Sequence, residues 1–168
     1  NAPTSNIVSA AELAISLLLA SGLAGCTSSS KSAAADTKVP VTCKSLATGN
    51  NVSQVTVATR TAAAPTVKFP LPLKVGASQR KILKQGNGTM FGGGQLISFD
   101  FAGYNARTCE LFQATKYDGS DQISQLIASP TKDAPASVFC NVFSGARAGA
   151  TVVALLNAQD SHNGQAID

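Results

Sequence analysis

The sequence predicts an α+β domain in which an antiparallel sheet packs on one short helix. Three observations favour this class. Short β-prone segments separated by Gly, Pro and Asn run through most of the chain, one stretch repeats its apolar residues at helical spacing, and residues 151–156 form a near-continuous apolar run. Such a run is typical of a strand buried on both faces. Several strands around a single helix fit an antiparallel α+β plan.

The first expected strands lie between residues 52 and 84. Residues 52–57 alternate apolar and polar side chains, which predicts a half-buried strand. Prolines occur throughout residues 64–73, and they are tolerated at a sheet edge but not in a central strand. Residues 80–84 form a short apolar and basic segment that ends at the turn signal Gly86-Asn87-Gly88.

The clearest strand is expected at residues 96–104. Its alternation places Ile97, Phe99 and Phe101 on one face. A turn at residues 105–108 then leads to two further expected strands, 110–115 and 122–128.

One short helix is expected before the last strand. Ala136, Phe139, Cys140 and Phe143 follow helical spacing and form one apolar stripe, and Gly145 ends it. The buried strand 151–156 needs a neighbour on each side, and residues 165–168 are too short to supply one. We therefore expect an incomplete domain whose terminal strand is missing.

An apolar stretch from Leu13 to Gly25 precedes Cys26 and predicts a bacterial lipoprotein signal. The stretch is too short for a bilayer core, which needs about 20 apolar residues. A buried core helix is the alternative, but the serines and glycines within the stretch disfavour it. We expect residues 1–25 to be the signal peptide, Cys26 to carry lipid on the extracytoplasmic face of the cell membrane, and residues 26–39 to be a flexible tether. No Lys or Arg precedes the stretch, so its start looks truncated.

Charge and cysteine content narrow the classes of function. The net charge is +4, but the basic residues are scattered without interleaved aromatic side chains, so we expect a solvated surface and no nucleic-acid binding. The cysteines have no metal-ligand spacing, so we expect no metal. Export permits a disulfide, and we favour Cys43 with Cys140, which leaves Cys109 as a free thiol or paired outside this sequence.

Five segments, in order, resemble the FKBP-type peptidyl-prolyl isomerases, in particular a divergent actinobacterial lipoprotein branch. The lead-in strands are similar at residues 67–73 and 79–83, and the turn is similar at 85–88. The family's pocket strand resembles residues 99–105, and its turn into an apolar strand resembles 145–151. The resemblance implies an FKBP-like domain over residues 67–168, preceded by a β-prone extension over 40–66.

The resemblance also implies which residues would form the site. Phe101 stands where the family usually has a pocket Tyr, Phe112 where it has a pocket Phe, and Gln113 where it has an Asp. Phe139 would lie near the floor of the apolar bowl, and His162 near its rim. The family uses no nucleophile, metal or cofactor. Its bowl takes the X-Pro amide out of water, and the barrier to rotating a peptide bond is about 18–20 kcal/mol.

The sequence thus predicts a membrane-anchored lipoprotein that helps exported, proline-containing polypeptides to fold. Because Phe101 and Gln113 change two polar contacts of the usual pocket, we expect a weak or inactive isomerase. The alternative is a noncatalytic chaperone or peptide-binding module of the cell envelope that uses the same bowl. A structural lipoprotein without a bowl is the third interpretation. Each Phe is also a candidate for plain core, and His162 for an exposed loop.

Overall fold

The computed structural model describes residues 6–14 and 43–161, and these form a mixed α+β fold with antiparallel strand pairing. Cys26, the expected tether and His162 lie outside the described residues. The strands are β1 (Asn6–Ala14), β2 (Thr56–Arg60), β3 (Ala63–Lys68), β4 (Gln79–Lys84), β5 (Gln95–Phe99), β6 (Ala102–Asn105), β7 (Leu111–Ala114), β8 (Ile123–Ile127) and β9 (Thr151–Leu156). The helices are α1 (Asn50–Ser53), α2 (Val138–Phe143) and α3 (Ala158–Ser161).

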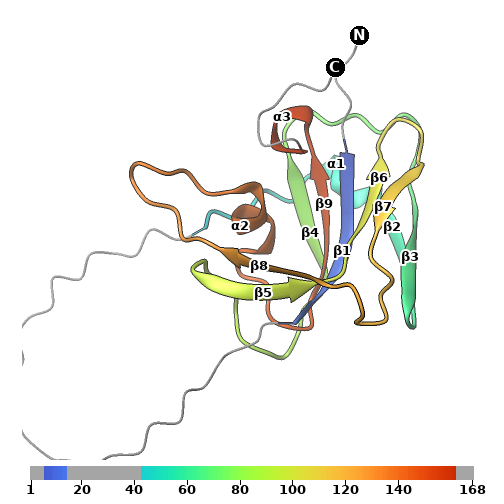
Figure 1. Ribbon diagram of the computed structural model, residues 1–168. Helices are drawn as coiled ribbons and strands as arrows, with labels where there is room; N and C mark the ends of the chain where they lie inside the picture. Colours follow the sequence, from blue (N-terminus) through green and yellow to red (C-terminus); the bar gives the residue numbers. More distant parts are fainter. Residues whose placement is uncertain (1–5, 15–42, 162–168) are drawn as a thin grey trace, which may run out of the picture.

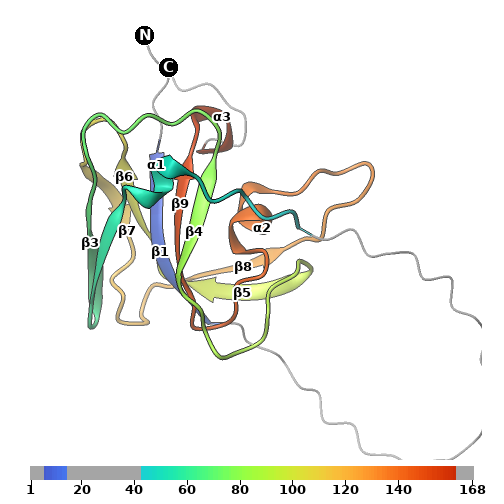
Figure 2. The same ribbon diagram turned by 180° about the vertical axis from the view of Figure 1, so that it is seen from behind.

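Within the described residues, the main sheet has the order β4-β9-β1-β5-β8, with β6 on β1 and β7 on β6. In Figure 1, β4, β9 and β1 run upright side by side, and β5 with β8 crosses their lower end beside α2. A separate hairpin of β2 and β3 lies at the far side of β6 and β7. Viewed from behind in Figure 2, α1 lies over β4 and β9.

The apolar run 151–156 is a fully buried strand, as predicted, and it divides the core in two. Val152 and Ala154 belong to one hydrophobic cluster, whereas Val153 and Leu155 belong to the other. This follows from the alternation of side chains along a strand.

The expectation that this strand would lack a second neighbour is wrong. β9 pairs with β4 on one side and with β1 on the other, both antiparallel. The second strand that pairs with β9 is therefore β1, residues 6–14, which the sequence analysis assigned to the signal peptide. The apolar stretch was expected to begin at Leu13, and the pairing of Leu13 with Phe99 places that residue in β1.

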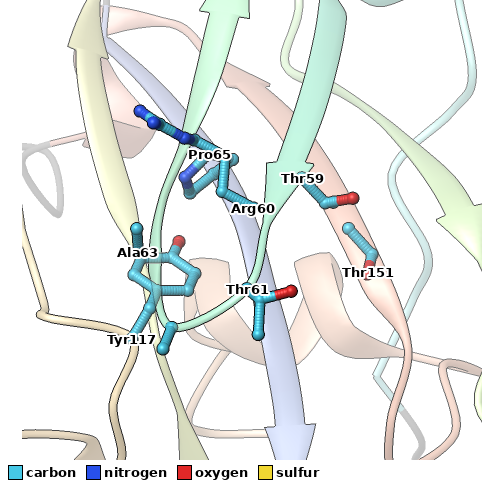
Figure 3. Close-up of a pocket in the computed structure, with 8 residues that line it drawn as sticks. Thr59, Arg60, Thr61, Ala63, Pro65, Tyr117 and Thr151 are labelled. Carbon is cyan, nitrogen blue, oxygen red and sulfur yellow. The ribbon is translucent and has the colours of Figure 1, made fainter.

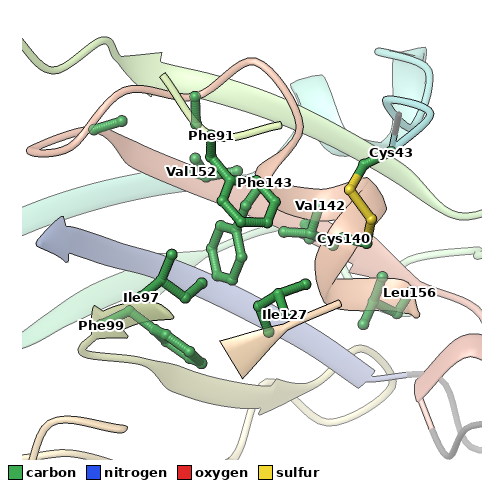
Figure 4. Close-up of a cluster of buried hydrophobic side chains, with 13 residues drawn as sticks. Cys43, Phe91, Ile97, Phe99, Ile127, Cys140, Val142, Phe143, Val152 and Leu156 are labelled. Carbon is green, nitrogen blue, oxygen red and sulfur yellow. A yellow bond between two sulfur atoms is a disulfide. The ribbon is translucent and has the colours of Figure 1, made fainter. Parts of the chain in front are cut away.

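The first cluster lies between the sheet and α2, where the helical stripe was predicted. Cys140 and Phe143 are buried in it, and Ala136 and Phe139 pack against it. Figure 4 shows Phe143 among Phe91, Ile97 and Ile127 in this cluster. Ser137 caps the N-terminus of α2, and its hydroxyl accepts a hydrogen bond from the Cys140 amide at 3.2 Å.

The second cluster lies under the β2–β3 hairpin. Val52, Val55 and Val67 pack there with Val153 and Leu155, so residues 43–66 share a core with the main sheet. The strand expected over residues 52–57 is only half right, because α1 takes up residues 50–53 before β2 begins at Thr56. Side-chain alternation alone did not distinguish one helical turn from a strand.

The strand expected over residues 96–104 is broken into β5 and β6 at Asp100. Ile97 and Phe99 are buried in the first cluster and Phe101 packs against it, so the predicted face is confirmed. Beyond Phe101, Ala102 and Tyr104 enter the second cluster. The segments expected as strands at 110–115 and 122–128 form β7 and β8.

Candidate functional site

The candidate site lies where the aromatic residues singled out from the sequence reach the junction of α2 with β5 and β6. Phe139 stacks on Phe143 with ring centroids 6.1 Å apart and contacts Phe99 at 5.7 Å. Phe101 and Phe139 are both partly exposed while packing against the same buried cluster. Phe101 and Phe139, both predicted site residues, therefore pack against the same apolar cluster.

Phe112 and Gln113 are placed by a β-bulge in β7. Gly103 pairs with Gln113 and Tyr104 with Leu111, which leaves Phe112 as the extra residue. The Phe112 ring lies over Gly103, because a Cβ built on that glycine would come within 2.6 Å of the ring. Phe101 and Gly103 are two residues apart in an extended chain and share a face. Phe112 thus covers the same side of β6 that Phe101 occupies.

The site is an open apolar surface rather than a closed cavity. Phe112 is 53% exposed, and Gln113 is exposed beside it. No ring pair among the described aromatic residues joins Phe112 or Phe101 to Phe139. The described residues bring Phe101 and Phe139 to one cluster and Phe112 with Gln113 to the neighbouring strand.

A buried polar network lies directly below this surface. The Asp100 carboxylate accepts hydrogen bonds from the Thr115 hydroxyl and from the Gln122 amide, each at 2.8 Å. The same hydroxyl accepts from the Phe101 amide at 3.1 Å. The network fixes the backbone at Phe101, and sequence reasoning missed it because alternation treated Asp100 as a solvent-facing residue.

Arg80 was counted among the scattered surface charges, and that placement is wrong. Its side chain is only 8% exposed and donates to the Val142 carbonyl at 2.7 Å and to the Ser45 hydroxyl at 2.9 Å. Burial lowers the pKa of this guanidinium. Since Val142 lies in α2, Arg80 holds the helix against β4 and thereby positions Phe139.

A disulfide joins Cys43 and Cys140, the pair that the sequence favours, with Cα atoms 5.2 Å apart (Figure 4). It ties residue 43 to α2 beside the aromatic cluster. Cys109 is a free cysteine, and its thiol lies 3.7 Å from the Val67 carbonyl.

A hollow of about 280 Å³ opens elsewhere, at the tip of the β2–β3 hairpin. Figure 3 shows Thr59, Thr61 and Thr151 on one side of it and Tyr117 on the other. None of the predicted site residues that the structure describes lines this hollow. It depends on a hairpin packed against β9, which is a long-range contact that no local pattern signals.

Within the part of the chain that the structure describes, no His, Cys, Asp or Glu side chains gather in a group suited to a metal ion. The helices there are too short or too polar to cross a bilayer.

Comparison with known proteins gave no match to a protein-family model, to a curated protein or to a solved structure.

Proposed function

We propose that this chain is an extracytoplasmic lipoprotein whose FKBP-like domain binds proline-containing segments of exported polypeptides and acts as a weak peptidyl-prolyl isomerase. The observation that carries the proposal is the apolar surface at the junction of α2 with the sheet. There Phe101 and Phe139 pack against the same hydrophobic cluster, and Phe112 lies on the adjoining strand. The disulfide supports an oxidising, extracytoplasmic location.

The surface would act by removing the X-Pro amide from water. The planar amide is more charge-separated than the twisted one, so apolar surroundings disfavour it more. Phe101 and Phe139 would flank the proline ring, and the exposed Phe112 would cover it on binding. Gln113 lies beside Phe112 as a neutral polar side chain, where a carboxylate would give a charge-assisted contact to the bound backbone.

Isomerase activity is tested by following cis–trans exchange of a Leu-Pro peptide with the full chain. We expect slow catalysis that falls at least tenfold in Phe139→Ala. Restoring polarity with Gln113→Asp and Phe101→Tyr should raise turnover, whereas a noncatalytic binder would change only in affinity. Gln125→Asp, the same change on exposed β8, is the matched control and should leave the rate unchanged. Undetectable turnover in all of these variants would contradict the isomerase proposal.

Lipid attachment is tested separately in a bacterial host. Wild-type protein should partition with membranes, and mass spectrometry should find Cys26 as a lipid-modified N-terminus. Cys26→Ser should abolish both results, while Cys109→Ser should change neither. Unmodified Cys26 within an uncleaved chain would overturn the proposed anchor.

A further inference from the structure

β1 is the strand that connects the two parts of the main sheet. It lies between β9 and β6, antiparallel to both: Val8 is opposite Ala154 on one side and Gly103 on the other. At its far end, Leu13 is opposite Phe99 of β5. Among the described strands, the β4–β9 pair is linked to β6–β7 and to β5–β8 only through β1.

The same residues lie inside the proposed signal peptide, and one molecule cannot use them for both purposes. Cleavage before Cys26 would remove residues 6–14 from the domain. β9 would then lose its backbone partner along Asn6–Glu12, although every residue of β9 is buried. Unpaired backbone N–H and C=O groups in such a position are costly, so the gap between β9 and β6 strongly favours a new strand.

The surroundings of the gap define the chemistry of that strand. Val152 and Ala154 of the adjacent strand face the α2 cluster, whereas Val153 and Leu155 face the hairpin cluster. A strand beside β9 therefore lies between two apolar layers. Strands covered on both faces are apolar at successive positions and exclude proline from their interior.

We propose that the place of β1 is a strand-acceptor slot, which in the processed protein binds an extended, proline-free apolar segment of an unfolded client by β-strand addition to β9 and β6. This inference rests on the proposed processing at Cys26. The slot would hold a client segment next to the proline surface, because Phe101 directly precedes β6. Backbone pairing would supply affinity, and the two apolar layers would select the sequence.

The slot is tested in the full chain with Val8→Pro, which removes a backbone donor from the middle of β1. Val8→Ala keeps that donor and is the matched control. The probe is a fluorescent peptide with the sequence of residues 6–14, and its twin carries proline at the position of Val8. We expect the probe to bind Val8→Pro at least tenfold more tightly than wild type or Val8→Ala, and the twin not to bind.

An unrelated Val- and Leu-rich peptide without proline should compete with the probe, as expected for a client segment. Equal binding to Val8→Pro and wild type would overturn the slot. Binding of the twin as tight as that of the probe would also overturn it. A Val8→Pro dimer that excludes both peptides would assign the slot to a second copy and overturn the client assignment.

If Val8→Pro does not fold, a protease site inserted among residues 27–39 replaces it, and the full chain is cut after folding. Exchange of the released N-terminal piece for the probe supports the slot, and no exchange overturns it. Peptide exchange without lipid on Cys26 in cells would show that the slot accepts a strand, but it would overturn the proposed maturation and with it the binding of clients in cells. Maturation without peptide exchange would overturn the slot alone.

Discussion

The two faces of β9 are stabilised in different ways. The α2 face, built on Phe91, Phe99 and Phe143, is aromatic and is cross-linked by the disulfide. The hairpin face, built on small aliphatic residues such as Val52 and Val67, has the hollow at its edge. The cross-linked face is the one that carries Phe139, so the disulfide and the aromatic packing both hold α2 at the candidate site.

The largest expected effect is from Phe143→Ala on the α2 face. Loss of a buried Phe costs about 3–5 kcal/mol, because an unfilled cavity adds to the lost transfer free energy. Val67→Ala on the hairpin face removes two buried carbons and should cost about 1–2 kcal/mol. Urea unfolding of the two variants measures both. Equal losses in the free energy of unfolding would contradict the larger contribution that we assign to the α2 face.

Removing the disulfide should have the next largest effect. Cys43 and Cys140 are 97 residues apart, so their cross-link constrains a long loop in the unfolded chain. The Cys43→Ala and Cys140→Ala double variant should lose about 2–5 kcal/mol. Cys109→Ala serves as a control and should lose less than half as much. If the double variant melts at the wild-type temperature, the cross-link does not stabilise the α2 face.

A smaller effect is expected from the polar network below the site. Asp100→Ala leaves the Thr115 and Gln122 donors without their acceptor and should cost about 1–3 kcal/mol. Asp133→Ala removes only an exposed pair with Lys132, worth about 0–1 kcal/mol. Chemical denaturation measures both, and an equal cost would show that Asp100 does not hold the backbone at Phe101.

Tyr104 gives the smallest effect, on the hairpin face. Its hydroxyl donates to the Pro65 carbonyl at 2.8 Å, so Tyr104→Phe should cost about 1 kcal/mol at neutral pH. Burial, with Cys109 nearby, raises the pKa of this phenol above its ordinary value of 10.0. The neutral phenol thus contributes stability that is complete below pH 10 and is lost as the pH rises through the folded-state pKa.

Tyr104→Phe should therefore flatten the fall in stability above pH 10, as followed by unfolding at a series of alkaline pH values. A fall of the same slope in wild type and variant would show that other groups control alkaline unfolding.

The sequence correctly predicted those elements whose apolar residues form a recognisable pattern within the element itself. The stripe from Ala136 to Phe143 predicted α2, and the apolar run 151–156 predicted β9. The prolines near Pro65 predicted an edge segment, and among the described strands β3 pairs with β2 alone, in a separate two-stranded sheet. These results follow from side-chain spacing, which is a local property.

Long-range partners could not be predicted in this way. Nothing local to Arg80 signals that it would reach the Val142 carbonyl, and nothing local to Asp100 signals Thr115 as its partner. The pairing of β1 with β9 joins opposite ends of the chain. Of the candidate site, the sequence predicted the aromatic residues, whereas their support comes from contacts that only the fold creates.

The most direct test of the proposed site is NMR chemical-shift mapping of the labelled full chain with a Leu-Pro peptide. We predict that the shifted backbone amides cluster at Phe101, Phe112, Gln113 and Phe139. The hollow at the hairpin, marked by Thr59 and Thr151, should be unaffected. Shifts confined to the hollow, or no shifts at a saturating peptide concentration, would contradict the account.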